Sequence, residues 1–356
     1  MNAKLGRRAR RHEIAADASV ADRYIEQCGW GDGLPVIAPT EQLVARMLAA
    51  TQRSAHEVLG RMEPHKGEVT IEKVAANAVM AGCYPEHFCV VLASVKAVLQ
   101  KQFHVGSSAC TTGGAAPVII VSGPIAEKME INSGTGCFGG GYRANASIGR
   151  ALRLTMRNLG GAKPGGEEKS THGWPGKLTC CFAENEKRSP WEPLRVEAGY
   201  ARDASTVTVV AVRGLYPVCE GTQTTGTGIL ETLAGAMRAM GSPIYNQGAR
   251  NEIPVVVVLG PEHATEIARA GFSKQEVKRY LFEHAQLPMR ELAGRMYAGT
   301  DPFPEWIDVS NPDAMVPMVA NPDGFIVVVA GGDGRHSAWM PAWNVSQSAT
   351  ELIDDI

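Results

Sequence analysis

The residues with the clearest chemical potential lie in the stretch Asn132–Gly161. Five glycines fall between Gly134 and Gly141, with Cys137 among them, and arginines follow. A glycine-rich loop that leads into a helix N-terminus exposes backbone N–H groups, which favour anions. The loop fits neither the Walker pattern nor a clean Gly-x-Gly-x-x-Gly, so a purely structural loop is the alternative. The residues predicted here to bind a phosphate or carboxylate group are Gly139, Gly140, Gly141, Arg143 and Asn145.

Two cysteines are candidate catalytic thiols. Cys137 lies inside the glycine cluster, where N–H dipoles and Arg143 are expected to lower the pKa of the thiol and raise its thiolate fraction. Cys110 lies in a second stretch of small residues, Ser107–Gly114, which we expect to be a loop.

The turn Gly331–Ser337 offers a histidine after a strand of buried character. His336 is a candidate general acid or base there, or a group that orients a ligand; a surface histidine is the alternative. Asp333, Arg335 and Ser337 beside it are predicted to bind substrate.

Strands and helices must position these groups. The strands expected from β-branched runs are Val118–Val121, Lys177–Phe182, Thr206–Val212, Val255–Leu259 and Phe325–Ala330. The helices expected from caps and apolar spacing include one after Thr40, one after Ser54, one after Thr70, one after Pro85, Ala144–Leu159, Ile229–Met240, Pro261–Ala270, Ser273–Gln286 and Pro288–Tyr297.

Two pairs of segments resemble each other in pattern and order. Pro117–Pro124 and Pro254–Pro261 share Pro, four β-branched residues, one variable residue, Gly and Pro. Lys187–Trp191 and Gly334–Trp339 both end in Ser-x-Trp after a strand. Chance similarity is the alternative to duplication. A duplication would place sites where two similar halves meet, beyond the carboxyl ends of strands.

The predicted fold class is α/β, with two similar α/β halves, a possible internal duplication, and a mainly helical N-terminal region. The predicted regions are a basic flexible arm (1–14), the helical region (15–105), a first half with the glycine loop (106–215) and a second half (216–356).

Composition narrows the class of partner. The chain has 356 residues, 44% hydrophobic and 20% charged, with a formal net charge of −2, so nucleic acid is not an expected partner. No apolar run approaches roughly 18 residues, and the basic N-terminus has no apolar run after it, so we expect no membrane partner and a cytoplasmic location. Eight cysteines form no Cys-x-x-Cys pair, as expected of reduced thiols.

Several blocks together resemble a known group of sequences. They are Gly31–Pro35, Glu72–Asn77, Ala144–Arg150, Ala183–Glu186 and Ser189–Pro193. The pattern is similar to an uncharacterised bacterial protein family loosely associated with UGSC-type thiol and selenol proteins. Because this chain lacks a Cys-Gly-Ser-Cys motif, a redox role is not implied by the resemblance.

The sequence therefore favours an enzyme of lyase or hydrolase type that acts on a small anionic, carboxylate-like substrate. The alternatives are a thiol-redox enzyme and a non-catalytic ligand-binding protein or partner subunit of a larger complex. No organic cofactor and no metal-binding residues are predicted, a bound metal stays open, and a homo-oligomer is expected.

Overall fold

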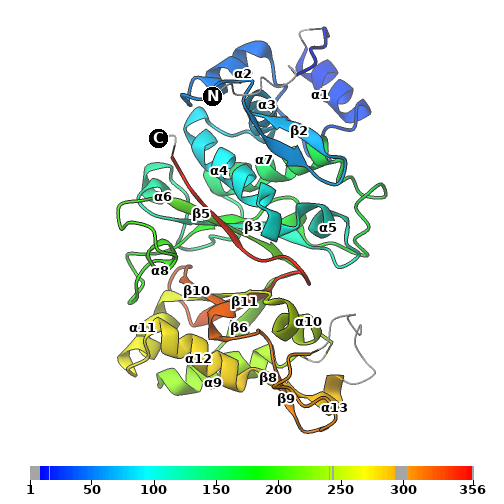
Figure 1. Ribbon diagram of the computed structural model, residues 1–356. Coiled ribbons are helices and arrows are strands. Elements are labelled where there is room, and N and C mark those ends of the chain that lie inside the picture. The colour runs from blue at the N-terminus through cyan, green and yellow to red at the C-terminus, as the bar shows by residue number, and fades with distance from the viewer. Residues whose placement is uncertain (1–8, 16, 240, 243, 293–302, 355–356) are drawn as a thin grey trace.

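The computed structural model describes residues 9–15, 17–239, 241–242, 244–292 and 303–354, and the fold is mixed α/β (Figure 1). The α-helices are α1 (Ala18–Gln27), α2 (Glu41–Leu48), α3 (Ile71–Ala81), α4 (Phe88–Leu99), α5 (Val105–Cys110), α6 (Ile125–Lys128), α7 (Arg143–Gly160), α8 (Leu194–Glu197), α9 (Gly226–Met237), α10 (Ile244–Asn251), α11 (Pro261–Arg269), α12 (Lys274–His284) and α13 (Met289–Leu292). The strands are β1 (Val58–Met62), β2 (Gly67–Thr70), β3 (Ala116–Ser122), β4 (Cys181–Ala183), β5 (Thr206–Val212), β6 (Tyr216–Cys219), β7 (Val255–Leu259), β8 (Gln286–Pro288), β9 (Met315–Pro317), β10 (Phe325–Val329), β11 (His336–Pro341) and β12 (Ala349–Leu352). Short 3-10 helices are η1 (Pro85–His87), η2 (Lys101–Phe103), η3 (Pro175–Lys177) and η4 (Pro322–Gly324).

Two four-stranded sheets stack between layers of helices. The first sheet has the order β12-β5-β3-β4 and is covered by α3, α4 and α7, whereas the second has the order β10-β7-β11-β6 and is covered by α9, α11 and α12 (Figure 1). Successive side chains of a strand point to opposite faces. In β3, Ile119 and Val121 therefore join the core under α3, α4 and α7, while Val118 and Ile120 join the core shared with the second sheet.

The two sheets have the same internal topology. In the first, β3 pairs parallel with β4 and antiparallel with β5; in the second, β7 pairs parallel with β10 and antiparallel with β11. The edge strands are exchanged. β6 follows β5 in the chain but pairs with β11, and β12 follows β11 but pairs with β5. This shared order is consistent with a duplication, which itself stays a prediction.

Of the two pairs of similar segments, only one pair occupies equivalent strands of the two sheets. Pro117–Pro124 covers β3 except for its first residue, and Pro254–Pro261 contains β7, so the first pair occupies equivalent strands. The Ser-x-Trp pair does not, because Trp339 lies within β11 whereas Trp191 lies in a turn after β4. The prediction that Lys187–Trp191 and Gly334–Trp339 are equivalent is therefore wrong.

The predicted helix after Ser54 is also wrong. Residues 58–70 form the antiparallel hairpin of β1 and β2 instead. Gly60 and Pro64 both oppose a helix here. The hairpin also brings backbone against backbone, since a Cβ on Gly67 would lie 2.0 Å from the carbonyl oxygen of Leu159 in α7.

A second correction concerns the small residues before β3. Ser107–Gly114, expected to be a loop, begins as the second half of α5. The small residues serve close packing, because a Cβ on Gly106 would lie 2.6 Å from Glu63 Oε2.

Other expectations agree more closely. Thr40, Thr70 and Ser273 cap α2, α3 and α12 through their side chains. The predicted strand Lys177–Phe182 is shorter and shifted, as β4, and the predicted helix Pro288–Tyr297 is described only as α13, since residues 293–302 lie outside the described residues.

The N-terminal arm can be judged only from residue 9 onward. The Ala9 N–H donates to Glu72 Oε2 at 2.9 Å, and His12 Nδ1 lies 2.7 Å from the hydroxyl of Tyr24, so this part of the arm lies against the folded chain. Among the described residues, no helix is both long and apolar enough to cross a membrane.

Candidate functional site

The glycine loop, residues 132–142, connects α6 to α7 and is held from inside by Asn145. The Asn145 side chain is buried; its Oδ1 accepts from the Asn132 N–H at 2.8 Å, and its Nδ2 donates to the carbonyls of Asn132 (2.9 Å) and Cys137 (3.3 Å). Asn145 therefore fixes the loop instead of facing a ligand, contrary to its predicted binding role.

The loop faces the turn of residues 330–335, which follows β10 in the second half. The Gly331 N–H donates to the Ser133 carbonyl at 2.8 Å. A Cβ on Gly332 would lie 2.1 Å from Thr135 Oγ1 and 3.0 Å from its Cα, so only glycine allows this approach. The two halves thus meet through backbone contacts, which leave a space beside them.

That space is a pocket of about 350 Å³, which we call the junction pocket. The glycine loop contributes Cys137 and Gly139, and the second half contributes Asp333, His336 and Ser337. The structure therefore brings together five of the residues predicted from sequence, from both halves. The rest of the wall is largely backbone and apolar, from Thr135, Gly136, Phe138, Leu215, Pro217, Val258, Gly260, Ala330, Gly331, Gly332, Gly334 and Ala338.

The predicted arginines do not line this pocket. The Arg143 guanidinium lies 4.5 Å from the ring centroid of Tyr84, and its Nη1 donates to the carbonyl of Gly82. Arg335 donates to the carbonyls of Glu220, at 2.9 Å from Nε, and Gln223. Both cations are used to hold neighbouring backbone, so their predicted substrate contacts are wrong for this pocket. Gly140 and Gly141 also lie outside its wall.

The expectation of an acidic Cys137 thiol is wrong. Burial raises the pKa of Cys137 to about 11, outweighing the opposing effect of the N–H groups of Cys137 and Phe138. Cys110 lies at the end of α5, outside the pocket wall, and burial together with Glu167 and Glu168 raises the pKa of its thiol. Neither environment favours the thiolate that nucleophilic chemistry requires.

Sequence reasoning missed the most suggestive polar contact. Ser337 is a residue of the pocket wall, and its hydroxyl lies 2.8 Å from Nδ1 of His263, a buried residue of α11. The His263 Nε2 lies 3.1 Å from the carbonyl oxygen of Glu220, and the Gly260 N–H donates to Ser337 Oγ at 3.3 Å. A signal was present in the repeat, because His263 stands where the first unit has Ala126.

The tautomer of His263 follows from its partners. A carbonyl oxygen only accepts, so Nε2 is assigned the proton and Nδ1 a lone pair that accepts the Ser337 O–H. Burial lowers the pKa of His263, which favours this neutral form. A serine hydroxyl bonded to a neutral imidazole, whose other nitrogen is oriented by a third group, is the arrangement of an activated nucleophile.

The blocks that carry the family resemblance meet elsewhere. Arg150 donates to both oxygens of Asp32 at 2.7 Å and to the carbonyls of Leu34 and Pro35. A Cβ on Gly149 would lie 2.4 Å from Thr179 Oγ1, so this glycine lets α7 approach the segment before β4. These motif residues join α7 to its neighbours.

A comparison with models of known protein families finds no match, and neither does a comparison with curated protein sequences. The resemblance to the UGSC-associated family therefore stays a prediction. Within the part of the chain that the structure describes, no group of three or more His, Cys, Asp or Glu side chains could hold a metal ion.

Proposed function

We propose that the protein is an enzyme of hydrolase type that acts on a small carbonyl-bearing molecule in the junction pocket. The contact between Ser337 and His263 supports this proposal best, because it joins a serine of the pocket wall to a buried histidine that can act as its base. A hydrolase is favoured over the lyase also expected from sequence, since the pair suits acyl transfer.

The residues of the pocket wall favour a more specific substrate class than the small anion expected from the sequence. Among the described residues, no lysine or arginine lines the junction pocket. A carboxylic ester or amide fits better than a free carboxylate, because the carbonyl is neutral and the wall includes apolar groups such as Leu215, Pro217 and Val258.

The proposed reaction follows the geometry of the pair. Ser337 Oγ attacks the carbonyl carbon while its proton passes to Nδ1 of His263, and the imidazolium gives this proton to the leaving group as the carbon–leaving-group bond breaks. Water then attacks the acyl-serine, its proton passes to Nδ1, and Ser337 recovers a proton as the acid leaves. The carbonyl of Glu220 keeps its hydrogen bond to Nε2 throughout.

Backbone donors at the pocket wall suit the developing oxyanion. The N–H groups of Gly332 and Gly334 donate to no group that the structure describes, and both residues line the pocket. His336, exposed at the start of β11, is the proposed group that orients the substrate, and Asp333 also lines the pocket.

The experiment uses a fluorophosphonate, which adds to an activated serine oxygen with loss of fluoride. Intact mass and peptide mapping should show one adduct, on Ser337. Ser337→Ala should remove it, and His263→Asn should slow it by roughly 100-fold or more, since a positioned base contributes about this factor. Ser205→Ala is the matched control, because Ser205 lies next to the first residue of β5 and accepts from the Ile125 N–H, away from the pocket.

A folded wild-type protein that gains no adduct on Ser337 would contradict the proposal. So would an adduct that forms equally fast when His263 is replaced, because the histidine would then not act as the base.

A further inference from the structure

A second cavity, of about 550 Å³, lies between the C-terminal half of α7 and the segment of residues 162–178. It shares no wall residue with the junction pocket. We call it the basic cavity, because Arg153, Arg157 and Lys177 all line it.

The positive charges exceed the carboxylates available to balance them. Arg153 and Lys177 both pair with Glu168, at 3.4 and 3.0 Å. Their side chains are only 9% and 10% exposed, so water screens them little. Asp32 also lines the cavity, but Arg150 binds both of its oxygens. Glu168 thus balances one of the three cations, and two positive charges are left over.

Two of these cations have unused donors. Arg157 Nε is buried and has no hydrogen-bond partner among the described residues. Lys177 Nζ is also buried; its contact with Glu168 is an ion pair that lacks hydrogen-bond geometry. A buried donor without an acceptor is costly, and a buried charge more so. Because both atoms are covered by protein, an oxyanion in the cavity would meet them after the two side chains turn toward it.

The electrostatic environment agrees with this geometry. Burial lowers the pKa of Arg153, and the neighbouring Arg157 lowers it further. Burial and Arg153 lower the pKa of Lys177. The cations repel one another, and an anion between them would offset that repulsion.

The rest of the wall suits an organic group. Trp174 lies along it, with its indole N–H donating to the Val212 carbonyl at 3.3 Å, and Leu154 and Leu178 are close by. The volume exceeds what an inorganic ion needs, so an apolar body can follow the charged head.

We propose that the basic cavity binds an organic phosphate monoester, with its phosphate on Arg157 and Lys177 and its organic group against Trp174. A phosphate monoester carries a charge of about −2 at neutral pH and several acceptor oxygens, which matches two uncompensated cations. The site is separate from the junction pocket and does not depend on the proposed hydrolase activity.

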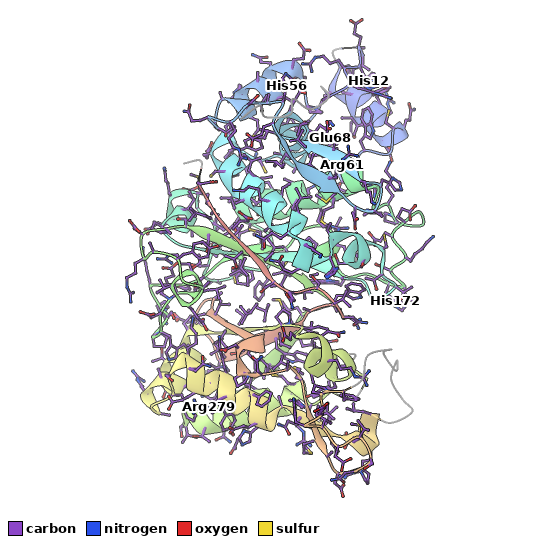
Figure 2. All side chains as sticks on the ribbon, viewed as in Figure 1. His12, His56, Arg61, Glu68, His172 and Arg279 are labelled. Atoms are coloured by element: carbon purple, nitrogen blue, oxygen red, sulfur yellow. The ribbon has the colours of Figure 1, made fainter. Side chains whose placement is uncertain are left out.

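The test is calorimetric titration with phenyl phosphate, inorganic phosphate and benzoate, with sodium chloride added to a constant ionic strength. Phenyl phosphate should bind saturably and more tightly than the other two. Arg157→Gln should weaken its binding about tenfold or more, the factor expected for one charge-assisted hydrogen bond. Arg279→Gln makes the same charge change on α12, in the helical layer beyond the second sheet, and should bind like the wild type (Figure 2).

Thermal unfolding separates a binding role from a structural one. Arg157 forms no ion pair with the described residues, so its replacement should leave the melting temperature of the ligand-free protein unchanged or raise it, while the rise caused by phenyl phosphate is lost. Three results would overturn the proposal: no saturable binding to the wild type, equal affinity of benzoate and phenyl phosphate, or equal binding by the Arg157 and Arg279 variants.

Discussion

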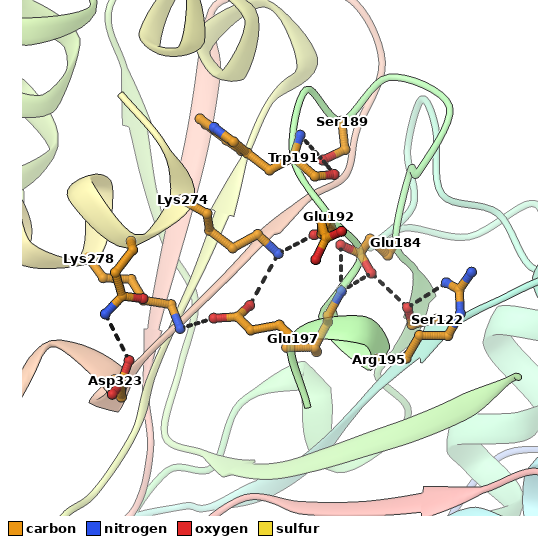
Figure 3. A network of polar contacts seen from close by, with 12 residues as sticks. Ser122, Glu184, Ser189, Trp191, Glu192, Arg195, Glu197, Lys274, Lys278 and Asp323 are labelled. Atoms are coloured by element: carbon orange, nitrogen blue, oxygen red, sulfur yellow. Dashed lines mark hydrogen bonds and ion pairs between the residues drawn. The ribbon is translucent and has the colours of Figure 1, made fainter. Parts of the chain in front are cut away.

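The two halves meet at two topologically equivalent junctions, and the junction pocket lies at one of them. In each, the turn after a parallel strand of one half, β4 or β10, faces the segment that follows the first helix of the other half. At the junction of β10, the facing segments are the glycine loop and residues 330–335, and the junction pocket lies there. At the junction of β4, residues 184–197 face residues 272–278, and large side chains occupy the space (Figure 3).

Ion pairs and a tryptophan close the second junction. Trp191 donates from its indole N–H to the Phe272 carbonyl at 3.0 Å, and Lys274 donates to the Glu192 carbonyl at 2.6 Å. Glu197 pairs with Lys274 at 3.2 Å and with Lys278 (Figure 3). The same topology therefore gives stability where side chains are long and charged, and a binding space where they are glycines.

The glycine that follows β3 and the glycine that follows β7 also differ in the group that accepts their N–H hydrogen bond. In the first half the Gly123 N–H donates to Glu186, which pairs with Arg195 in a charged network. In the second half the Gly260 N–H donates to Ser337, whose other partner is the neutral His263. The neutral pair of Ser337 and His263 is the one to which the proposed hydrolase chemistry is assigned.

The largest effect on stability is expected from a substitution that breaks the ion pairs at the junction of β4. Glu197→Gln leaves Lys274 and Lys278 without their shared carboxylate, and both are buried. Loss of one partner of a fully buried ion pair costs about 3–5 kcal/mol, but the Glu197 side chain is 27% exposed, so the free energy of unfolding in urea should fall by less, about 2–3 kcal/mol. Glu283→Gln, on the exposed side of α12, is the control and should stay within about 0.5 kcal/mol. A loss as small as that of the control would show that the ion pairs do not stabilise the junction.

The next largest effect is expected from a substitution that adds a side chain at the junction of β10. In Gly332→Ala the new Cβ would overlap Thr135, so the glycine loop must move, at an expected cost of about 1–3 kcal/mol in unfolding free energy and with loss of the Ser337 adduct. Gly140→Ala is matched to it, because its Cβ would meet no atom within 4 Å. Similar behaviour of the two variants would mean that the loop adjusts freely and does not define the pocket.

Local patterns predicted β3, β4, β5, β7 and β10 but missed β6, β11 and β12 of the two sheets. β5 and β7 are runs of β-branched residues, a signal that needs no tertiary context, and their predicted bounds are confirmed. The β1–β2 hairpin was missed because its strands are short and contain Gly60, whose role is to approach Leu99.

A site where the two halves meet was predicted, whereas the contact between Ser337 and His263 was not. The contact between Ser337 and His263 joins residues 74 positions apart, on different elements, which no local pattern records. The burial of Cys137 and the direction of Arg143 also depend on neighbours in space, and both reversed the predicted role.

The titration of His263 in the second half and that of Glu184 in the first half should change stability with pH in opposite directions. Burial lowers the pKa of His263 below its ordinary value of 6.5, so the unfolded chain binds this proton more readily. Its contribution to stability is complete above pH 6.5 and is lost as pH falls toward the lower, folded pKa. Urea unfolding across this range should show a smaller acid loss in His263→Asn than in wild type. His284→Asn, at an exposed site, should keep the wild-type slope; equal slopes in all three proteins would contradict the burial of a neutral imidazole.

The smallest expected effect concerns Glu184 of the first half, and its sign is reversed. Burial raises the pKa of Glu184 above its ordinary value of 4.5, although its hydrogen bonds with Ser122 and the Leu194 N–H oppose the shift. The folded state therefore binds this proton more readily, and the contribution of Glu184 is present below pH 4.5 and lost as pH rises through the raised pKa. Glu184→Gln keeps the shape of the side chain and an acceptor for Leu194, so it should remove this loss and make the protein relatively more stable near neutral pH than in acid. Stability that changes with pH in the same way in wild type and variant would show that Arg195 and Lys274 keep the carboxylate charged throughout, and the two turns would then differ in charge but not in the sign of their titration.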